Sequence, residues 1–343
     1  MERVVVNRYG GPEVLEVVEQ DAPHPGRGEV RVRVLAAGVS YADLLIRAGA
    51  YLGGPKPPFT PGYELVGIVD ELGEDCSSVR EGDRVAALTV WGSYAEQVCL
   101  SETEVVPVPA DIDSAKAVSL VLNYVTAQQL LHRIANAEPG ESVLVHGAAG
   151  GVGTAVLQLA RLADLRVYGT ASSSKCDLVE RLGGIAIDHT KDDFLARVRL
   201  LTGDGVDVAL DGIGGSVSLR SYRTLRRGGR LVIFGHASTI ADGRRSVRGW
   251  ISWYAATGYV GARGLASPRR SVLPYRIARV RDRHPGWFRD DLIAVAELLS
   301  RGEIDPIIAG RLPLREARRA HELLGAAAVQ GKLVLMPGSA TGG

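Results

Sequence analysis

The chain is poor in cysteine, with 3 among its 343 residues, at positions 76, 99 and 176. No two of them have the C-x-x-C spacing of a zinc site or a redox pair, and none is close to another in sequence. A disulfide framework and a cysteine-rich metal site are therefore not expected. The same scarcity suits a reducing compartment, so we expect a cytoplasmic protein.

Long hydrophobic runs and a charge excess are lacking too. No apolar stretch approaches the roughly 18 residues of a membrane-spanning helix. The 40 basic and 39 acidic residues leave a formal net charge of +1. A nearly neutral chain is not built for electrostatic binding to nucleic acid, so we expect neither a nucleic-acid nor a membrane partner.

The first 110 residues or so carry short β signals. Residues 29–34 (EVRVRV) alternate polar and apolar side chains, and 65–69 and 84–87 are further short strands between glycine and proline turns. Many short strands with frequent turns favour a compact barrel.

From about residue 115 the pattern changes to alternating helices and strands. A helix over 114–135 precedes a strand at 142–146. This alternation predicts an α/β fold with a doubly wound parallel sheet. The predicted strands are 142–146, 166–170, 185–187, 206–210 and 230–234, and the helices between them are 153–162, 175–182, 194–201 and 218–225.

A glycine-rich turn joins the first of these strands to its helix. In the motif G-x-G-x-x-G, Ala148 replaces the first glycine, while Gly150 and Gly153 take the other two places. Gly150 would admit a pyrophosphate to the backbone, and Gly153 would let the helix pack closely on the sheet. The alternative is an ordinary strand–helix turn. The predicted cofactor-binding residues here are Ala149, Gly150, Gly151, Val152 and Gly153.

The end of the second predicted strand indicates which cofactor binds. Enzymes that use NAD place Asp or Glu there to hold the ribose hydroxyls. Here the sequence is Gly169-Thr-Ala-Ser-Ser-Ser-Lys175, without an acid. We expect Ser172, Ser173 and Lys175 to receive a 2′-phosphate, which predicts NADPH. Ser174 would serve equally as a cap of the next helix, and the two roles are compatible.

Several stretches together resemble a known family. The pattern resembles the zinc-free quinone oxidoreductase branch of the medium-chain dehydrogenase/reductase family, with VAT-1-like and enoyl reductase-like members particularly close. The resemblance covers nearly the whole chain and weakens over 240–290. It rests on residues 123–127, 145–153 and 169–175, supported by 37–43, 47–51, 61–64 and 331–335.

The resemblance implies a GroES-like β-barrel catalytic domain (1–122), a Rossmann domain for NADPH (123–265), and an Arg-rich connection that returns to the catalytic domain (266–343). It implies a homodimer, joined at a sheet edge that we expect near residues 256–260. It also implies roles for further residues. Lys175 and His189 would hold the 2′-phosphate, and Thr126, Gly235, His236 and Lys332 would also contact the cofactor.

The zinc-dependent relatives have Cys where Ser40 stands and His where Tyr63 stands. Without these ligands we expect no metal, because a catalytic zinc keeps three protein ligands. Hydride addition to a conjugated acceptor then needs a hydrogen-bond donor and a proton source. Tyr51, on a loop rich in Gly and Pro, is the leading candidate. Ser40 and Tyr63 are further catalytic candidates, and Tyr63 would serve equally to fill the former zinc space.

Residues 243–289 contain 11 arginines and one acid, Asp282. They would form a solvated or dimer-facing surface, an entrance for an anionic substrate tail, or a contact with nucleic acid or membrane. The expected function is therefore an NADPH-dependent reductase of quinones or enones. The alternatives are an enoyl-thioester reductase of a polyketide-type pathway and a cofactor-binding interaction protein without turnover.

Overall fold

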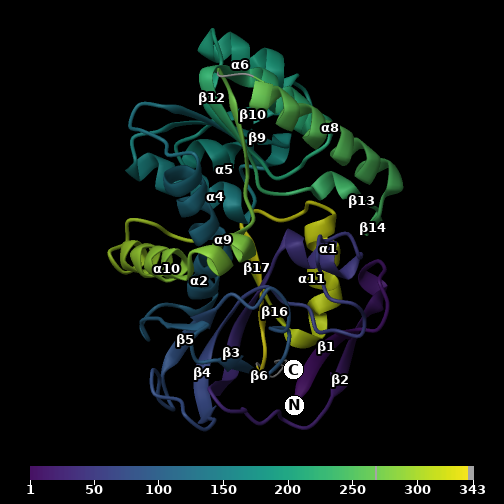
Figure 1. Cartoon of the computed structure of the whole chain (residues 1–343), viewed down its shortest axis with the longest axis vertical. Helices are drawn as coiled ribbons and strands as arrows, with labels where there is room; N and C mark the ends of the chain where they lie inside the picture. The colour runs from purple at the N-terminus through teal and green to yellow at the C-terminus, as the bar shows by residue number, and fades with distance from the viewer. Residues whose placement is uncertain (267–268, 339–343) are drawn as a thin grey trace. The chain divides into compact units, whose positions relative to one another are not determined.

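The structure is a computed structural model that describes residues 1–266 and 269–338 (Figure 1). The chain divides into two units, each with its own sheet. Unit 1 comprises Met1–Leu122, Asp242–Arg245 and Leu292–Gly343, and unit 2 comprises Asn123–Ala241 and Ser246–Asp291. The chain thus leaves unit 1 for unit 2 and later returns to it.

Unit 2 contains a six-stranded sheet whose strands are all parallel, in the order β10-β9-β8-β11-β12-β15. The two innermost strands, β8 and β11, are followed outward by later strands on each side, the arrangement of a doubly wound Rossmann sheet. The strands are β8 Ser142–His146, β9 Arg166–Ala171, β10 Ile185–Asp188, β11 Val206–Asp211, β12 Leu225–Ile233 and β15 Ser271–Pro274, with the short β13 Ile240–Ala241 outside this sheet.

Helices connect these strands, as right-handed parallel crossovers require. Val143, Leu144 and Val145 of β8 are fully buried, as expected for a strand covered on both faces. The core continues through Ile187 of β10 and Val198 of α6. The helices are α3 Val125–Gln128, α4 Gly151–Leu162, α5 Cys176–Arg181, α6 Phe194–Thr202, α7 Ser216–Thr224, α8 Val247–Ala266 and α9 Ile277–Arg283.

The strand predicted near residues 256–260 is wrong, because α8 runs through it. Trp250, Ala256 and Val260 are buried while Ile251 and Tyr254 are exposed, which is the periodicity of a helix and not of a strand. The sheet edge is instead β15, which pairs with β12 alone in the described sheet.

Unit 1 contains a seven-stranded sheet in the order β16-β17-β3-β4-β5-β7, with β6 paired to β3, and a separate pair, β1 and β2. The return strand β17 lies antiparallel to β3, with Leu333 opposite Val39. The strands are β1 Glu2–Val6, β2 Leu15–Glu19, β3 Glu29–Val39, β4 Leu65–Leu72, β5 Arg84–Ala87, β6 Gln97–Ser101, β7 Val105–Pro107, β14 Arg244–Arg245, β16 Ile308–Pro313 and β17 Lys332–Met336.

The helices of unit 1 are α1 Tyr41–Arg47, α2 Ser114–Ser119 and α11 Ala317–Gly325, while α10 Pro285–Ser300 passes from unit 2 into unit 1. The helix predicted over 114–135 is helical up to Ile134, but it alternates α-helix with π-helical turns at Leu120–Tyr124 and Gln129–Ile134. Within the described ranges, no helix combines the length and the apolar character needed to cross a bilayer.

Candidate active site

The glycine turn of unit 2 lies between β8 and α4. Gly150 is the N-cap of α4 and supplies no side-chain hydrogen bond, so the amides of the first helical turn keep no partner within the helix. A Cβ on Gly153 would lie 2.4 Å from the Gly147 carbonyl oxygen, so only glycine fits there. Gly151 and Val152 contribute amides of the same turn. These free donors and the positive end of the helix dipole fit a pyrophosphate.

The predicted phosphate loop follows β9. Residues Ser173–Lys175 form one 3-10 turn, and burial lowers the pKa of the partly buried Lys175 ammonium. The His189 amide donates to the Ala171 carbonyl at 3.0 Å, which brings the exposed His189 beside this loop. Ser172, Ser173, Lys175 and His189 therefore lie close together at the ends of β9 and β10.

The chain after β12 passes through Gly235 and His236. A Cβ on Gly235 would lie 2.5 Å from the Gly212 carbonyl oxygen, so the two loops run in close contact. The His236 ring packs at 5.5 Å between centroids against Trp253, and burial lowers the pKa of His236. Thr126 lies on α3 and is 4% exposed. Ala149, in the glycine turn, is also buried.

In unit 1, Tyr51 and Tyr63 form a hydroxyl pair with 2.7 Å between their oxygens. The rings meet edge to face, with their centroids 6.1 Å apart. Tyr51 lies on the loop after α1, where its amide donates to the Leu45 carbonyl at 3.1 Å. Tyr63 is 2% exposed, whereas Tyr51 is partly exposed. The pair thus connects a buried tyrosine to a partly exposed one.

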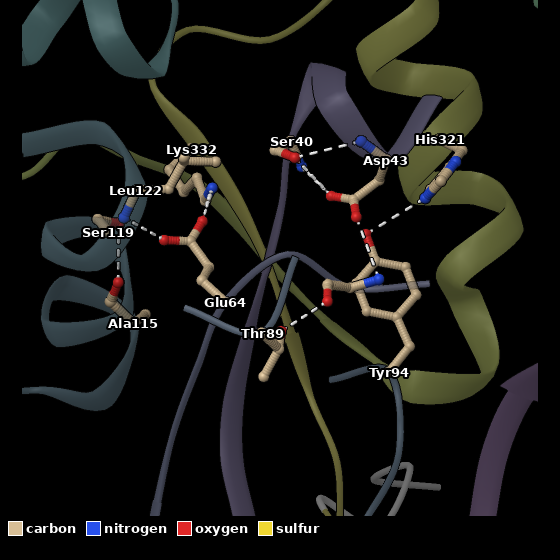
Figure 2. Close-up of polar contacts among 11 residues, drawn as sticks. Ser40, Asp43, Glu64, Thr89, Tyr94, Ala115, Ser119, Leu122, His321 and Lys332 are labelled. Carbon is tan, nitrogen blue, oxygen red and sulfur yellow. Dashed lines mark hydrogen bonds and ion pairs between the residues drawn. The ribbon is translucent and has the colours of Figure 1, made fainter. Parts of the chain in front are cut away.

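Ser40 is the N-cap of α1 and forms a capping box with Asp43 (Figure 2). Its hydroxyl donates to Asp43 Oδ2 at 2.6 Å, and its amide donates to the same oxygen at 2.8 Å. Asp43 Oδ1 accepts the Gly62 amide at 3.1 Å. Gly62 has φ of +109°, a left-handed conformation that favours glycine. Asp43 therefore fixes the turn that presents Tyr63.

A chain of buried side chains extends from Asp43. The Tyr94 hydroxyl hydrogen-bonds to Asp43 and lies 3.2 Å from His321 Nε2, while His321 Nδ1 lies 3.0 Å from Arg47 Nη1. A guanidinium only donates, so His321 Nδ1 accepts and Nε2 carries the proton toward Tyr94. We call Ser40, Asp43, Arg47, Tyr94 and His321 the buried polar cluster.

Electrostatics in this cluster follow from burial. Burial raises the pKa of the Asp43 carboxyl, and hydrogen bonds from Ser40 oppose that shift. Burial and the neighbouring Arg47 lower the pKa of His321 well below its ordinary value, which keeps the ring neutral. Burial lowers the pKa of Arg47 to about 10.

Lys332, at the start of β17, forms a buried ion pair with Glu64 (Figure 2). Their side chains are 3% and 0% exposed. Glu64 Oε2 also accepts the Leu122 amide at 2.7 Å. Burial raises the pKa of Glu64, and Lys332 opposes the shift. The structure thus gives Lys332 a carboxylate partner inside unit 1.

Sequence reasoning missed most of the buried polar cluster. The spacing of Ser40 and Asp43 is that of a capping box, which could have been recognised. Arg47 is one helical turn from Asp43, but Tyr94 and His321 are distant from both in sequence, so no local signal could have grouped them. Among the described residues, no group of three or more His, Cys, Asp or Glu side chains is placed to hold a metal ion.

Comparisons with known proteins agree with the division into a GroES-like unit and a Rossmann unit. Residues 26–110 match the family model of the alcohol dehydrogenase GroES-like domain, and residues 184–335 match that of zinc-binding dehydrogenase. The chain is 30% identical to the quinone oxidoreductase of Lama guanicoe over 342 residues, covering 98% of this chain and 97% of that protein. It is 31% identical to the human synaptic vesicle membrane protein VAT-1 homolog over 350 residues, covering 98% and 86%.

Among solved structures, Escherichia coli quinone oxidoreductase in complex with NADPH aligns with a TM-score of 0.85 and 28% identity, covering 98% of this chain and 100% of that one. The Rossmann sheet, the GroES-like unit and these matches define an oxidoreductase. The chain belongs to the medium-chain dehydrogenase/reductase family, in its quinone oxidoreductase branch.

Proposed function

We propose that the protein reduces quinones or conjugated enones with NADPH, without a metal, and that Tyr51 supplies the hydrogen bond or proton that the reaction needs. The observation that carries the proposal is the 2.7 Å contact between the hydroxyls of Tyr51 and Tyr63. Either hydroxyl of this pair can be the donor, and hydrogen-bonded hydroxyls polarise one another, which strengthens the outer phenol as a hydrogen-bond donor to a ligand.

Bound NADPH supplies a hydride. Addition to the β-carbon of an enone places negative charge on the carbonyl oxygen as an enolate. The Tyr51 hydroxyl would donate to that oxygen, and a proton would then reach the α-carbon, so that one hydride and one proton saturate the double bond. Hydrogen-bond donors at a developing oxyanion are among the largest contributions to catalysis. The proposal requires the Tyr51 hydroxyl to reach the acceptor.

The choice of a conjugated acceptor follows from the residue types. A simple carbonyl is commonly polarised by zinc, which prefers thiolate and imidazole ligands. Ser40 offers a hydroxyl that is already engaged by Asp43, and Tyr63 a phenol engaged by Tyr51. We therefore expect less than stoichiometric zinc by elemental analysis and activity that survives dialysis against a chelator. One tightly bound zinc per chain, lost together with activity, would contradict the metal-free mechanism.

The decisive experiment is NADPH oxidation measured over matched panels of quinones, enones and enoyl thioesters. Turnover of the first two classes is the expected result. Turnover of enoyl thioesters alone would move the function to the enoyl-reductase alternative. NADPH binding without turnover of any class would leave a cofactor-binding protein and would contradict the proposal.

We include two further expectations in the proposal. A cytoplasmic location fits the three free cysteines. A homodimer fits the edge strand β15, whose outer backbone groups are a template for pairing with a second sheet. Light scattering at micromolar concentration tests the second expectation, which a monomer would contradict.

A further inference from the structure

The place where the 2′-phosphate is expected contains a carboxylate that the sequence motif does not reveal. Asp188 ends β10, and in the parallel register it lies opposite Ala171, the last residue of β9. The side chain of Asp188 is only 14% exposed. The end of the second strand lacks an acid in sequence, yet the neighbouring strand supplies one to the same loop.

Asp188 accepts hydrogen bonds from both loops that meet there. The Ser173 hydroxyl donates to Asp188 Oδ2. The Thr190 hydroxyl and amide donate to Oδ1 at 2.6 and 3.0 Å. The Lys191 ammonium lies 3.5 Å from Oδ2. The hydrogen bonds from Ser173 and Thr190 lower the pKa of the Asp188 carboxyl below its ordinary value, so it is ionised at neutral pH.

These contacts decide what Ser173 and Lys191 can offer a ligand. A serine hydroxyl has one proton, and here that proton is directed to Asp188. Ser173 therefore presents only lone pairs to a phosphate, which needs donors. The exposed Lys191 ammonium lies close enough to the carboxylate for the two opposite charges to attract. Asp188 also adds a fixed negative charge beside a group that carries close to two negative charges.

We propose that Asp188 is a specificity-determining residue that weakens NADPH binding relative to NADH, by engaging the Ser173 hydroxyl and Lys191 and by repelling the 2′-phosphate. Lys175 and His189 give the loop its preference for the phosphorylated cofactor, and Asp188 limits it. A reductase must release NADP⁺ in every turnover, and a carboxylate at this place favours release. The inference concerns cofactor binding alone, so it stands or fails independently of the acceptor and of Tyr51.

The test is isothermal titration calorimetry of the whole chain with NADPH and with NADH. It measures the Kd of each cofactor for the wild type and for Asp188→Asn. Asparagine keeps the size and an acceptor oxygen for Thr190 but removes the charge. The Kd for NADPH should fall by about tenfold, which corresponds to about 1.4 kcal/mol, because the removed charge no longer repels the phosphate. The Kd for NADH should stay within about twofold. The gain should shrink at high salt, because ions screen exposed charges.

Two further variants isolate the mechanism. Ser173→Ala alone should change NADPH affinity little, because its proton is already used, but it should weaken NADPH binding in the Asp188→Asn background. Asp177→Asn removes the same charge from the exposed first turn of α5 and should have a smaller effect. Unchanged or weaker NADPH binding by Asp188→Asn would overturn the proposal. An equal gain in NADPH affinity in Asp177→Asn would also overturn it. A loss of affinity confined to NADH in Asp188→Asn would overturn it as well, and would make Asp188 a ribose ligand.

Discussion

The glycine turn of unit 2 differs from the buried polar cluster of unit 1 in the groups that form it. The turn offers main-chain amides and close backbone approach, and its side chains contribute little. The cluster is made of buried charged, hydroxyl and imidazole side chains that come from α1 with its N-cap, from the segment before β6 and from α11. Main-chain recognition needs only a local pattern of glycines, whereas a side-chain network needs the whole unit to be folded before any member is satisfied.

This difference predicts where substitutions act on stability and where they act on binding. Removing a member of a buried charge pair should destabilise the unit that contains it. Removing a side chain at the cofactor loops should leave the fold intact and change affinity. The following variants test whether stability and binding separate in this way, and they are given in order of decreasing expected effect.

Lys332→Met should have the largest effect, because it leaves Glu64 as a buried, unpaired charge. Breaking a buried pair costs about 3–5 kcal/mol of stability. Denaturant unfolding measures the loss. The double variant Lys332→Met with Glu64→Gln should recover much of it, since both charges are then gone. A Lys332→Met protein as stable as wild type would show that the pair is not structural.

Tyr51→Phe should lower the rate of enone reduction by about 10²-fold, the usual cost of losing one oxyanion donor. Quinone reduction should suffer less, because its reduced oxygens can take protons from water. The ratio of the two rate losses is the informative quantity, with NADPH affinity and melting temperature expected to stay unchanged. Tyr41→Phe, on α1, is the matched control. Equal and small losses on both substrates would assign Tyr51 to the pocket wall.

Lys175→Ala should reduce the preference for NADPH over NADH by about tenfold, since one charge-assisted contact with the 2′-phosphate contributes on the order of 1.5 kcal/mol. Cofactor titration measures it. Lys191→Ala should lose less, because Lys191 is held by Asp188. An unchanged ratio of the two affinities in Lys175→Ala would show that Lys175 has no such role.

His321 should produce the smallest effect, a dependence of stability on pH. Its folded pKa lies below the ordinary value of 6.5, so the unfolded chain binds the proton first as the pH falls. The stability is complete above about pH 6.5 and decreases below it by up to about 1.4 kcal/mol per pH unit. His321→Gln should flatten this slope, while His24→Gln, at an exposed histidine, should not. Identical slopes in all three proteins would be evidence against a buried neutral ring.

The contrast between the regions also explains what the sequence could predict. The parallel sheet and the Gly150–Gly153 turn follow from apolar runs and from a motif whose meaning is local. The strand near 256–260 was wrong because a run of small and β-branched residues also suits a helix packed on one side. The motif could not predict Asp188 beside the phosphate loop, because this acid comes from a neighbouring strand. It lies 17 residues after Ala171 in sequence but opposite it in register.

The pairing of β17 with β3 has a consequence for synthesis on the ribosome. Unit 2 is continuous from residue 123 to residue 241 and can gather most of its strands as they emerge. Unit 1 cannot assemble in this way. The edge of β3 at Ala37–Val39 and the carboxylate of Glu64 both find their partners in β17, which is synthesised more than 200 residues later. At about 5–20 residues per second, the delay before these partners emerge is roughly 13–60 s. During this delay the β3 edge is unpaired and the Glu64 carboxylate has no Lys332 partner. Nascent unit 1 is therefore the part of this chain that most needs a chaperone.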